Sequence, residues 1–253
     1  MEGLGKVTAA ILAGGLGTRL RSIVADRPKV LAEVCGRPFL TYLLDQLEGA
    51  GIEFAVLCTG YLGEQVRAKF GDRYNGIRLA YSQESAPLGT AGALRLALPQ
   101  FNSDLVLILN GDSFCASNLR SFWEWHCARE SEVTIFLTHI ADTARFGRVQ
   151  LNRQDRILRF EEKTGKAVPG WINAGIYLMK REFLGEIPVE KPVSLEREIF
   201  PNLLNFRFHG YRCQVDFIDI GTPEAFEDAK RFFCQSHEPK IPTVCAAGPG
   251  RNH

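Results

Sequence analysis

Residues 12–20 read Leu-Ala-Gly-Gly-Leu-Gly-Thr-Arg-Leu, and they directly follow an apolar run at 7–12. The run predicts a short buried strand, and the glycines predict a tight loop at its carboxyl end. Because glycine has no Cβ, the loop N–H groups can approach a triphosphate closely, and Arg19 and Lys29 add positive charge. The segment has no Walker ending, and Leu20 replaces the last glycine of the dinucleotide fingerprint. It therefore predicts a phosphate-binding loop of another kind.

Outward from this loop, strand and helix patterns alternate. Strands are expected at 7–12, 54–59, 77–81 and 105–109, and helices at 39–50, 62–70 and 91–98. Such alternation indicates βαβ units and a parallel sheet. After about residue 115 we expect a helix at 119–129, strands at 133–138, 172–179 and 216–220, hairpin strands at 146–151 and 157–160, and a last helix at 224–233. The fold class is thus α/β, Rossmann-like, with a mixed and mainly parallel sheet flanked by helices.

The composition limits the other possibilities. The chain has 253 residues, 45% of them hydrophobic, which suits one globular domain at 1–235 followed by a mobile tail rich in Pro and Gly at 236–253. With a net charge of +1 and interspersed charges, we expect no nucleic-acid partner, and no apolar run is long enough for a membrane span. The seven cysteines form no C-x-x-C pair, so we expect buried free thiols and a cytoplasmic location.

Seven motifs together resemble the sugar nucleotidyltransferase family. Besides 12–20 they are Pro-Leu-Gly-Thr-Ala-Gly at 87–92, Gly-Asp at 111–112, Phe-Gly-Arg-Val at 146–149, Glu-Glu-Lys at 161–163, Asn-Ala-Gly at 173–175 and Phe-Ile-Asp-Ile-Gly-Thr-Pro at 217–223. They follow the family's order and span residues 9–228. The resemblance implies the fold of the nucleotide-diphospho-sugar transferases and an enzyme that joins a sugar 1-phosphate to a nucleoside triphosphate, releasing pyrophosphate.

Two aspartates stand at strand ends. Asp112 follows the strand at 105–109, and Asp219 lies in the late strand at 216–220. Ligands of open α/β sheets bind at the carboxyl ends of strands, and Mg²⁺ prefers one or two carboxylates together with phosphate oxygens and water. The resemblance implies that Asp112 and Asp219 together hold Mg²⁺ as the cofactor.

The resemblance also implies roles for the other site residues. It makes Arg19 and Lys29 the catalytic cations. It places the nucleotide against Leu12, Ala13, Gly14, Gly15, Gly17, Thr18, Glu84, Leu88, Gly89, Thr90 and Gly111. A carboxylate at Glu84 suits guanine, whose N1–H and N2–H₂ both donate, and suits the carbonyls of uracil poorly, so we expect GTP.

On the sugar side, Gly147, Glu162, Lys163, Asn173 and Gly175 match positions that line the sugar-phosphate pocket of the family. Thr164 replaces the usual Pro after Glu-Lys, so the local turn is expected to differ. The compact length and the motif at 217–223 most resemble the D-glycero-α-D-manno-heptose 1-phosphate guanylyltransferases of capsule or lipopolysaccharide biosynthesis.

Several alternatives stay open. Mannose 1-phosphate with GTP, or N-acetylmuramate 1-phosphate with UTP, would use the same motifs. A catalytically silent sugar-nucleotide sensor would keep the fold, although retention of Gly17, Arg19, Lys29, Asp112 and Asp219 argues against it. A Rossmann-type oxidoreductase is a third possibility, and the sequence leaves a homo-oligomer open.

Overall fold

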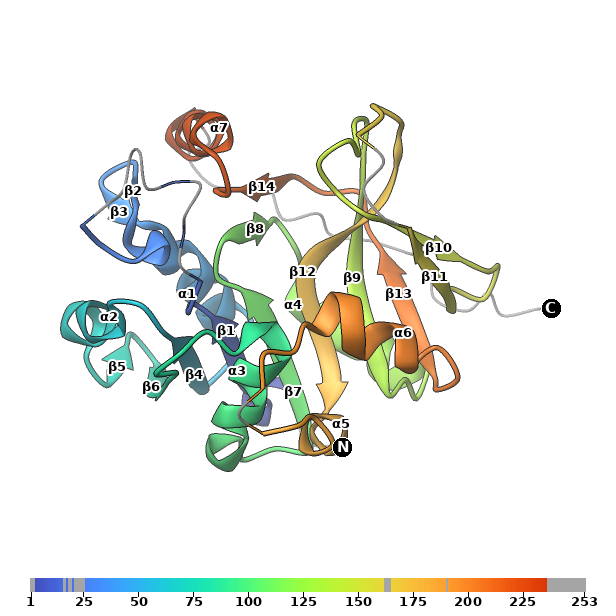
Figure 1. The fold of residues 1–253 in the computed structure, drawn as a ribbon, viewed down its shortest axis with the longest axis horizontal. Helices are drawn as coiled ribbons and strands as arrows, with labels where there is room; N and C mark the ends of the chain where they lie inside the picture. Colours follow the sequence, from blue (N-terminus) through green and yellow to red (C-terminus); the bar gives the residue numbers. More distant parts are fainter. Residues whose placement is uncertain are drawn as a thin grey trace.

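The computed structural model describes residues 3–15, 17, 20, 26–161, 165–189 and 191–235. A ten-stranded sheet crosses the whole molecule (Figure 1). Its strands are β1 (Thr8–Leu12), β4 (Phe54–Thr59), β5 (Arg73–Tyr74), β6 (Ile77–Gln83), β7 (Leu105–Asn110), β9 (Val133–Ile140), β10 (Arg148–Leu151), β11 (Ile157–Glu161), β12 (Gly170–Lys180) and β13 (Phe208–Arg212). Two smaller two-stranded sheets pair β2 (Glu33–Val34) with β3 (Arg37–Pro38), and β8 (Ser113–Cys115) with β14 (Phe217–Asp219).

The first half of the sheet is parallel. β7, β1, β4 and β6 lie side by side in that order, and each pair is parallel. The chain leaves β1 toward β4 and β6 and later returns to place β7 on the other side of β1. The strand order therefore reverses between β1 and β7, which is the place where open α/β sheets bind ligands.

Helices cover both faces of the sheet. They are α1 (Phe39–Gly49), α2 (Gly63–Phe70), α3 (Gly89–Ala97), α4 (Leu119–Ala128), α5 (Arg181–Gly185), α6 (Phe200–Asn202) and α7 (Pro223–Gln235). Because strand side chains alternate, Ile11 joins the core under α1, α4 and α7, whereas Ala10 joins the core under α3 and α6. Both cores are continuous layers of buried aliphatic and aromatic side chains, so β1 is buried on both faces.

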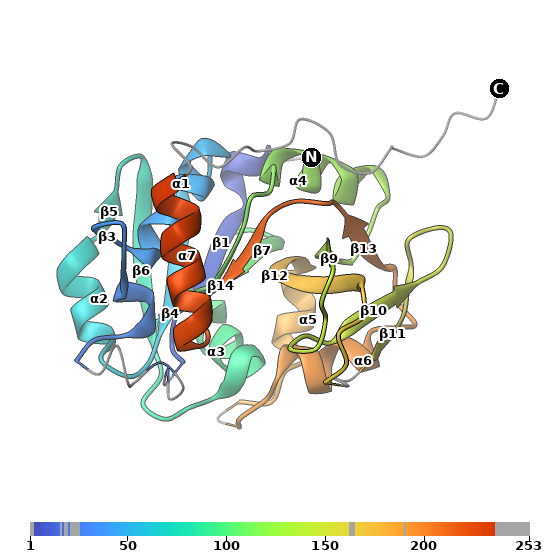
Figure 2. The same cartoon turned by 90° about the horizontal axis from the view of Figure 1, so that it is seen from above.

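The second half of the sheet is mostly antiparallel. β12 runs against both β7 and β9, and β13 lies parallel to β9 at the outer edge. β10 pairs with β12 only at Arg148 and Ile172, and it forms a hairpin with β11. After β14 the chain enters α7 (Figure 2). This helix begins with an N-terminal cap, because Thr222 Oγ1 accepts the N–H of Ala225 at 3.3 Å.

The predicted fold class is confirmed, and every predicted helix and strand exists within a few residues of its expected bounds. The sequence analysis missed the short strands β2, β3, β5 and β8, the strand β13 and the short helices α5 and α6. β13 escaped because its sequence, Phe-His-Gly-Tyr-Arg, has a glycine and two polar residues where strands usually carry β-branched ones. The division into one domain and a tail stays a prediction, since residues 236–253 lie outside the described residues.

The prediction of free thiols was only partly right. Cys58 and Cys115 are buried and free, as expected. Cys35 and Cys234, however, form a disulfide with Cα atoms 5.6 Å apart, and Cys213 is disulfide-bonded as well. No local spacing signals a bond across 199 residues, because only the packing of the β2–β3 turn against α7 brings these two cysteines together. None of the helices in the described part of the chain combines the length and apolar character needed to cross a bilayer.

Candidate active site

The glycine loop starts at the reversal point of the sheet. The N–H of Ala13 donates to the Cys58 carbonyl at 2.8 Å, and the N–H of Gly111 donates to the Leu12 carbonyl at 2.9 Å. These bonds place the ends of β1, β4 and β7 against one another. Gly15 has open space where a side chain would stand, and Gly17 packs against Lys29. Thr18 and Arg19 were predicted here and lie outside the described residues.

Asp112 and Asp219 come together at the same corner. The antiparallel pairing of β14 with β8 brings Asp219 beside the strand that follows Asp112, and the N–H of Ile220 donates to the Asp112 carbonyl at 2.9 Å. Lys29 Nζ lies 2.8 Å from Asp112 Oδ2. The position of a Cβ on Gly221 would lie 2.9 Å from Asp219 Oδ1 and 3.8 Å from Lys29 Nζ. The tertiary structure thus gathers two carboxylates and a lysine from distant parts of the sequence.

Arg145 is a fourth charged group at this corner, and the sequence analysis did not single it out. Its Nη2 lies 3.1 Å from Asp219 Oδ1 and 3.0 Å from Asp219 Oδ2. The only sequence signal was its place directly before the predicted motif at 146–149. Each aspartate therefore faces one cationic side chain.

The donor set suits a magnesium ion. Carboxylate oxygens are hard ligands, and the cationic groups of Lys29 and Arg145 stand against Asp112 and Asp219 where positive charge is favourable. Within the described residues no group of three or more His, Cys, Asp or Glu side chains converges. Asp112 and Asp219 would accordingly supply only part of a coordination shell and leave the rest to phosphate oxygens and water.

Glu84 lies in a cradle between the glycine loop and β4. Its Oε2 accepts the N–H of Leu88 at 3.0 Å. A Cβ on either Gly14 or Gly60 would come within 2.8 Å of Glu84 Oε1, so only glycine lets the backbone approach this closely. Burial raises the pKa of the Glu84 carboxyl, and the Leu88 N–H partly opposes the rise. Glu84 therefore joins the two segments that were predicted to bind the nucleotide.

The loop before α3 is held by hydrogen bonds to a later segment at 193–195. Gly89 has φ +71°, and a Cβ there would meet the Val193 carbonyl oxygen at 2.5 Å. The N–H of Val193 donates to the Leu88 carbonyl at 2.8 Å, and Thr90 Oγ1 accepts the N–H of Leu195 at 2.8 Å. The residues just before the helical turn at Leu195–Ile199 thus set the position of the predicted nucleotide loop.

A buried hydrogen-bond network joins the nucleotide loop to the predicted sugar motif. Tyr177 is fully buried, and its hydroxyl donates to Glu196 Oε1 at 3.2 Å while accepting Asn173 Nδ2 at 2.9 Å. Glu196 Oε2 in turn accepts the hydroxyl of Thr90 at 3.0 Å. Burial, followed by the Glu196 charge, raises the pKa of Tyr177 well above its ordinary value, so this hydroxyl stays a donor. Tyr177 was missed as a site residue, because inside a continuous strand it reads as core.

Asn110 adds an open acceptor to this network. Its Nδ2 lies 3.5 Å from the Tyr177 hydroxyl, and its buried Oδ1 has no hydrogen-bond partner among the described residues. A Cβ on Gly175 would meet Asn110 Nδ2 at 2.8 Å, so the predicted motif at 173–175 contacts the residue directly before the motif at 111–112. A buried acceptor of this kind fits a ligand hydroxyl or a water.

The remaining sugar-side residues lie on the β10–β11 side. A Cβ on Gly147 would come within 2.8 Å of the Glu161 carbonyl oxygen, and Phe146 packs edge-on against Phe217 of β14 with ring centroids 5.5 Å apart. The motif at 146–149 is therefore in contact with the strand that carries Asp219. Glu162 and Lys163 were predicted here and lie outside the described residues. The roles of all these residues stay predictions.

Comparison with known proteins agrees with this geometry. The family model described as "Nucleotidyl transferase" matches residues 8–236. The chain is 36% identical to a mannose-1-phosphate guanylyltransferase of Mycobacterium tuberculosis, covering 87% of this chain and 63% of that protein. It is also 36% identical to a D-glycero-alpha-D-manno-heptose 1-phosphate guanylyltransferase of Aneurinibacillus thermoaerophilus, over 88% of this chain and 96% of that protein. The crystal structure of HddC from Yersinia pseudotuberculosis complexed with GMP-PN superposes with a TM-score of 0.80 and 29% identity, covering 90% of this chain and 99% of that one.

Proposed function

The chain belongs to the nucleotidyl transferase family, and from this premise we propose that it transfers GMP from GTP to a sugar 1-phosphate, with a heptose 1-phosphate as the first candidate. Pyrophosphate and a GDP-sugar are the products. The observation that carries the proposal is the meeting of Asp112, Asp219 and Lys29 beneath the glycine loop. Guanylyltransferases among the relatives support the choice of base.

The reaction we propose is an in-line displacement at the α-phosphorus of GTP. An oxygen of the sugar 1-phosphate attacks, a new P–O bond forms, and the bond to the β-phosphate breaks with its electron pair going to pyrophosphate. The nucleophile is already anionic, so no general base is required, and catalysis depends on positioning and on charge neutralisation.

Each side chain has a defined task in this scheme. Asp112 and Asp219 would hold Mg²⁺, which when bound neutralises the phosphate oxygens at the reacting phosphorus. Lys29, together with Arg19 of the glycine loop, would stabilise the leaving pyrophosphate. The loop N–H groups would bind the triphosphate, and Asn173 and Gly147 would lie beside the sugar.

A panel of substrates tests the activity. GTP, UTP, dTTP, ATP and CTP are each combined with heptose, mannose, glucose and N-acetylmuramate 1-phosphates, and pyrophosphate release is followed with Mg²⁺ and with chelator. We expect turnover with GTP and the heptose phosphate, lost in chelator. Turnover with UTP alone, or binding of GDP-sugar without turnover for every pair, would contradict the proposal.

Mannose 1-phosphate is the second candidate. The Mycobacterium tuberculosis relative acts, by its name, on mannose 1-phosphate at the same 36% identity as the heptose enzyme. The chain spans 63% of that relative and 96% of the heptose enzyme, so the shared length favours the heptose. The ratio of kcat/KM for the two sugars decides between them.

Glu84→Gln tests the choice of GTP. An amide oxygen can still accept the Leu88 N–H, so the loop keeps its position, but the charged acceptor for the guanine N1–H and N2–H₂ is lost. We expect kcat/KM for GTP to fall by about tenfold or more while that for UTP does not fall. Equal losses for both nucleotides would show that Glu84 only holds the loop.

The pH dependence of GTP binding gives a second test of the role of Glu84. Because burial raises the pKa of Glu84, its charged form is disfavoured and its protonation begins above the usual range for glutamate. The affinity for GTP should therefore start to fall, as the pH is lowered, earlier than an ordinary carboxylate would dictate. In Glu84→Gln this part of the pH profile should disappear.

A further inference from the structure

The two cations at the corner differ in how firmly they are held. The Lys29 side chain is only 11% exposed, although its partner Asp112 is 51% exposed. The Arg145 side chain is 49% exposed while its partner Asp219 is 16% exposed. Arg145 therefore reaches in from the surface and can turn away at low cost, whereas Lys29 is part of the floor of the site.

The position of Arg145 links the metal corner to the predicted sugar motif. It lies in the connection between β9 and β10, directly before Phe146 and Gly147. Its guanidinium stands 5.6 Å from the centroid of the Phe146 ring, which in turn packs against Phe217 of β14. Arg145 therefore contacts Asp219 while it stands two positions before Gly147 in the chain.

We propose that Arg145 has two anionic partners in turn: Asp219 while no ion occupies the corner, and the sugar 1-phosphate once a divalent ion has taken Asp219. This rests on the proposed function. In the ion-free protein the two aspartates, Lys29 and Arg145 balance to zero charge. A divalent ion adds two positive charges beside the guanidinium and weakens its hold on Asp219.

The second partner of Arg145 should be an anion, because the bound divalent ion leaves the guanidinium without its carboxylate. The anion expected beside Gly147 is the sugar 1-phosphate, which carries up to two negative charges. A planar guanidinium can give two parallel N–H bonds to a phosphate, a fit that the ammonium of a lysine lacks. Arg145 is then a substrate-binding residue in one state and a competitor of the metal in the other.

These two roles predict opposite effects of one substitution. Without Arg145, the divalent ion should bind more tightly, because a competing cation is gone. The sugar 1-phosphate should bind more weakly, because a phosphate ligand is gone. A residue that only supported the local structure would weaken both, so the signs separate the two explanations.

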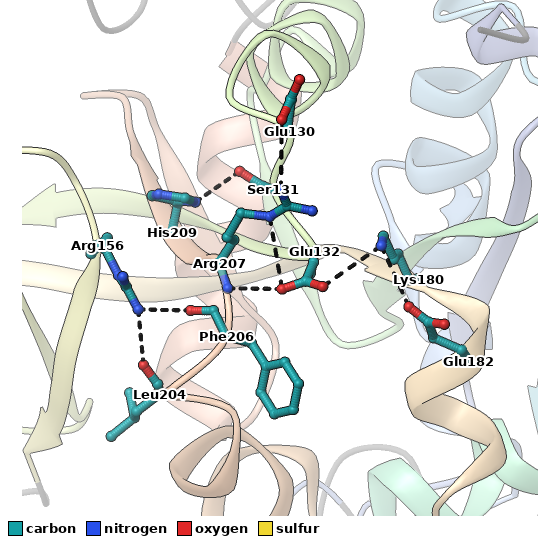
Figure 3. Close-up of polar contacts among 10 residues, drawn as sticks. All are labelled: Glu130, Ser131, Glu132, Arg156, Lys180, Glu182, Leu204, Phe206, Arg207 and His209. Atoms are coloured by element: carbon teal, nitrogen blue, oxygen red, sulfur yellow. Dashed lines mark hydrogen bonds and ion pairs between the residues drawn. The ribbon is translucent and has the colours of Figure 1, made fainter.

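The first measurement uses Mn²⁺ alone, with free Mn²⁺ followed by electron paramagnetic resonance. We compare the wild type, Arg145→Gln and the matched control Arg207→Gln. Arg207 also faces two carboxylates, those of Glu130 and Glu132, but at the amino ends of the strands (Figure 3). We expect Arg145→Gln to bind Mn²⁺ about three- to tenfold more tightly, and Arg207→Gln to match the wild type. Unchanged or weaker Mn²⁺ binding in Arg145→Gln would overturn the proposal.

The second measurement separates the substrates. In Arg145→Gln we expect KM for the sugar 1-phosphate to rise about tenfold or more and KM for GTP to change less than about twofold. Arg145→Lys should recover the charge but only part of the affinity. A parallel rise in both KM values would overturn the proposal. If the wild type turned over no substrate pair, the proposed function would fail, while the Mn²⁺ titration would still decide whether Arg145 competes for Asp219.

Discussion

Charged side chains gather at both ends of β7, yet only one end has the features of an active site. At the carboxyl end Asp112 and Asp219 face Lys29 and Arg145. At the amino end Lys180 faces Glu132 and Glu182, and Arg207 faces Glu130 and Glu132 (Figure 3). β7 has six residues, so the two groups are about 17 Å apart at roughly 3.3 Å per residue step.

The surroundings of the two groups differ. At the carboxyl end, glycines bring backbone N–H groups and carbonyls close together, and strands from opposite ends of the sequence converge. At the amino end a cavity of about 1150 Å³ is present, lined by Trp123, His126, Lys180 and Arg207 among others, but those two cations already share nearby carboxylates. Neither the size of a hollow nor the number of charges therefore marks the site. Strand direction does, because loops that bind phosphate follow the carboxyl ends of parallel strands.

The largest difference is expected from matching carboxylate substitutions at the two ends. Asp112→Asn removes a proposed metal ligand and should lower turnover by about 10³-fold or more with the fold intact, whereas Glu132→Gln should retain turnover within about twofold. Pyrophosphate release measures the rates, and circular dichroism checks the fold. Near-normal turnover in Asp112→Asn would remove the distinction between the two ends.

The second largest effect is expected when the pH is lowered, and it concerns the stability contributed by His126 at the amino end of β7. Burial, with smaller contributions from His209 and Lys180, lowers the pKa of His126 from 6.5 to about 4. The folded protein thus holds this histidine neutral, and the stability it contributes is present above pH 6.5 and is lost as the pH falls toward 4. The loss should be about 3 kcal/mol, measured by urea unfolding at a series of pH values. His126→Gln should flatten this part of the curve, and an unchanged slope would count against the assignment.

A smaller effect is expected from the network above the carboxyl end. Glu196→Gln keeps the size of the side chain but removes the charge that accepts the hydroxyls of Tyr177 and Thr90. We expect kcat/KM for GTP to fall about tenfold, because the nucleotide loop loses its fixed position. Tyr177→Phe should have a similar effect, and the double variant should lose less than the product of the two. Fully independent effects would show that the network does not act as a unit.

The smallest effect should come from the surface ion pairs of the amino end. Arg207 is 51% exposed, and both of its pairs are longer than 3.5 Å. Removing it in Arg207→Gln should change the free energy of unfolding by less than about 1 kcal/mol and should leave kcat unchanged. A loss of activity in this variant would mean that the amino end takes part in function after all.

Much of the fold was predictable because local patterns and tertiary structure agree in the parallel half. β1 and β4 are short apolar runs, and α1 and α3 have the spacing of half-buried helices, so each element was found within a few residues. β13 was not found, because its histidine, glycine and arginine interrupt the apolar pattern, and the buried His209 has its polar contact, at 2.8 Å, with Ser131. That contact joins residues far apart in sequence, and no local pattern signals it.

The candidate site divides in the same way. Asp112 could be predicted from the rule on strand ends, and Asp219 needed the motif around it. Arg145 carried no pattern of its own, since an arginine on a loop is an ordinary surface residue. Cys35 and Cys234 were wrongly predicted to be free thiols for the same reason, because they meet only when α7 packs against the β2–β3 turn.

By itself, the sequence determined the alternation of strands and helices, the glycine loop after the first strand and the residue types available for phosphate and metal binding. These properties are local: they depend on neighbours a few positions apart, through side-chain periodicity and the freedom of glycine. The tertiary structure alone decided which charges meet, namely that Lys29 and Arg145 lie beside Asp112 and Asp219. It also decided that Tyr177 joins the two segments predicted to bind the nucleotide and the sugar. Such contacts form only when distant segments pack together, so a short-range sequence pattern does not predict them.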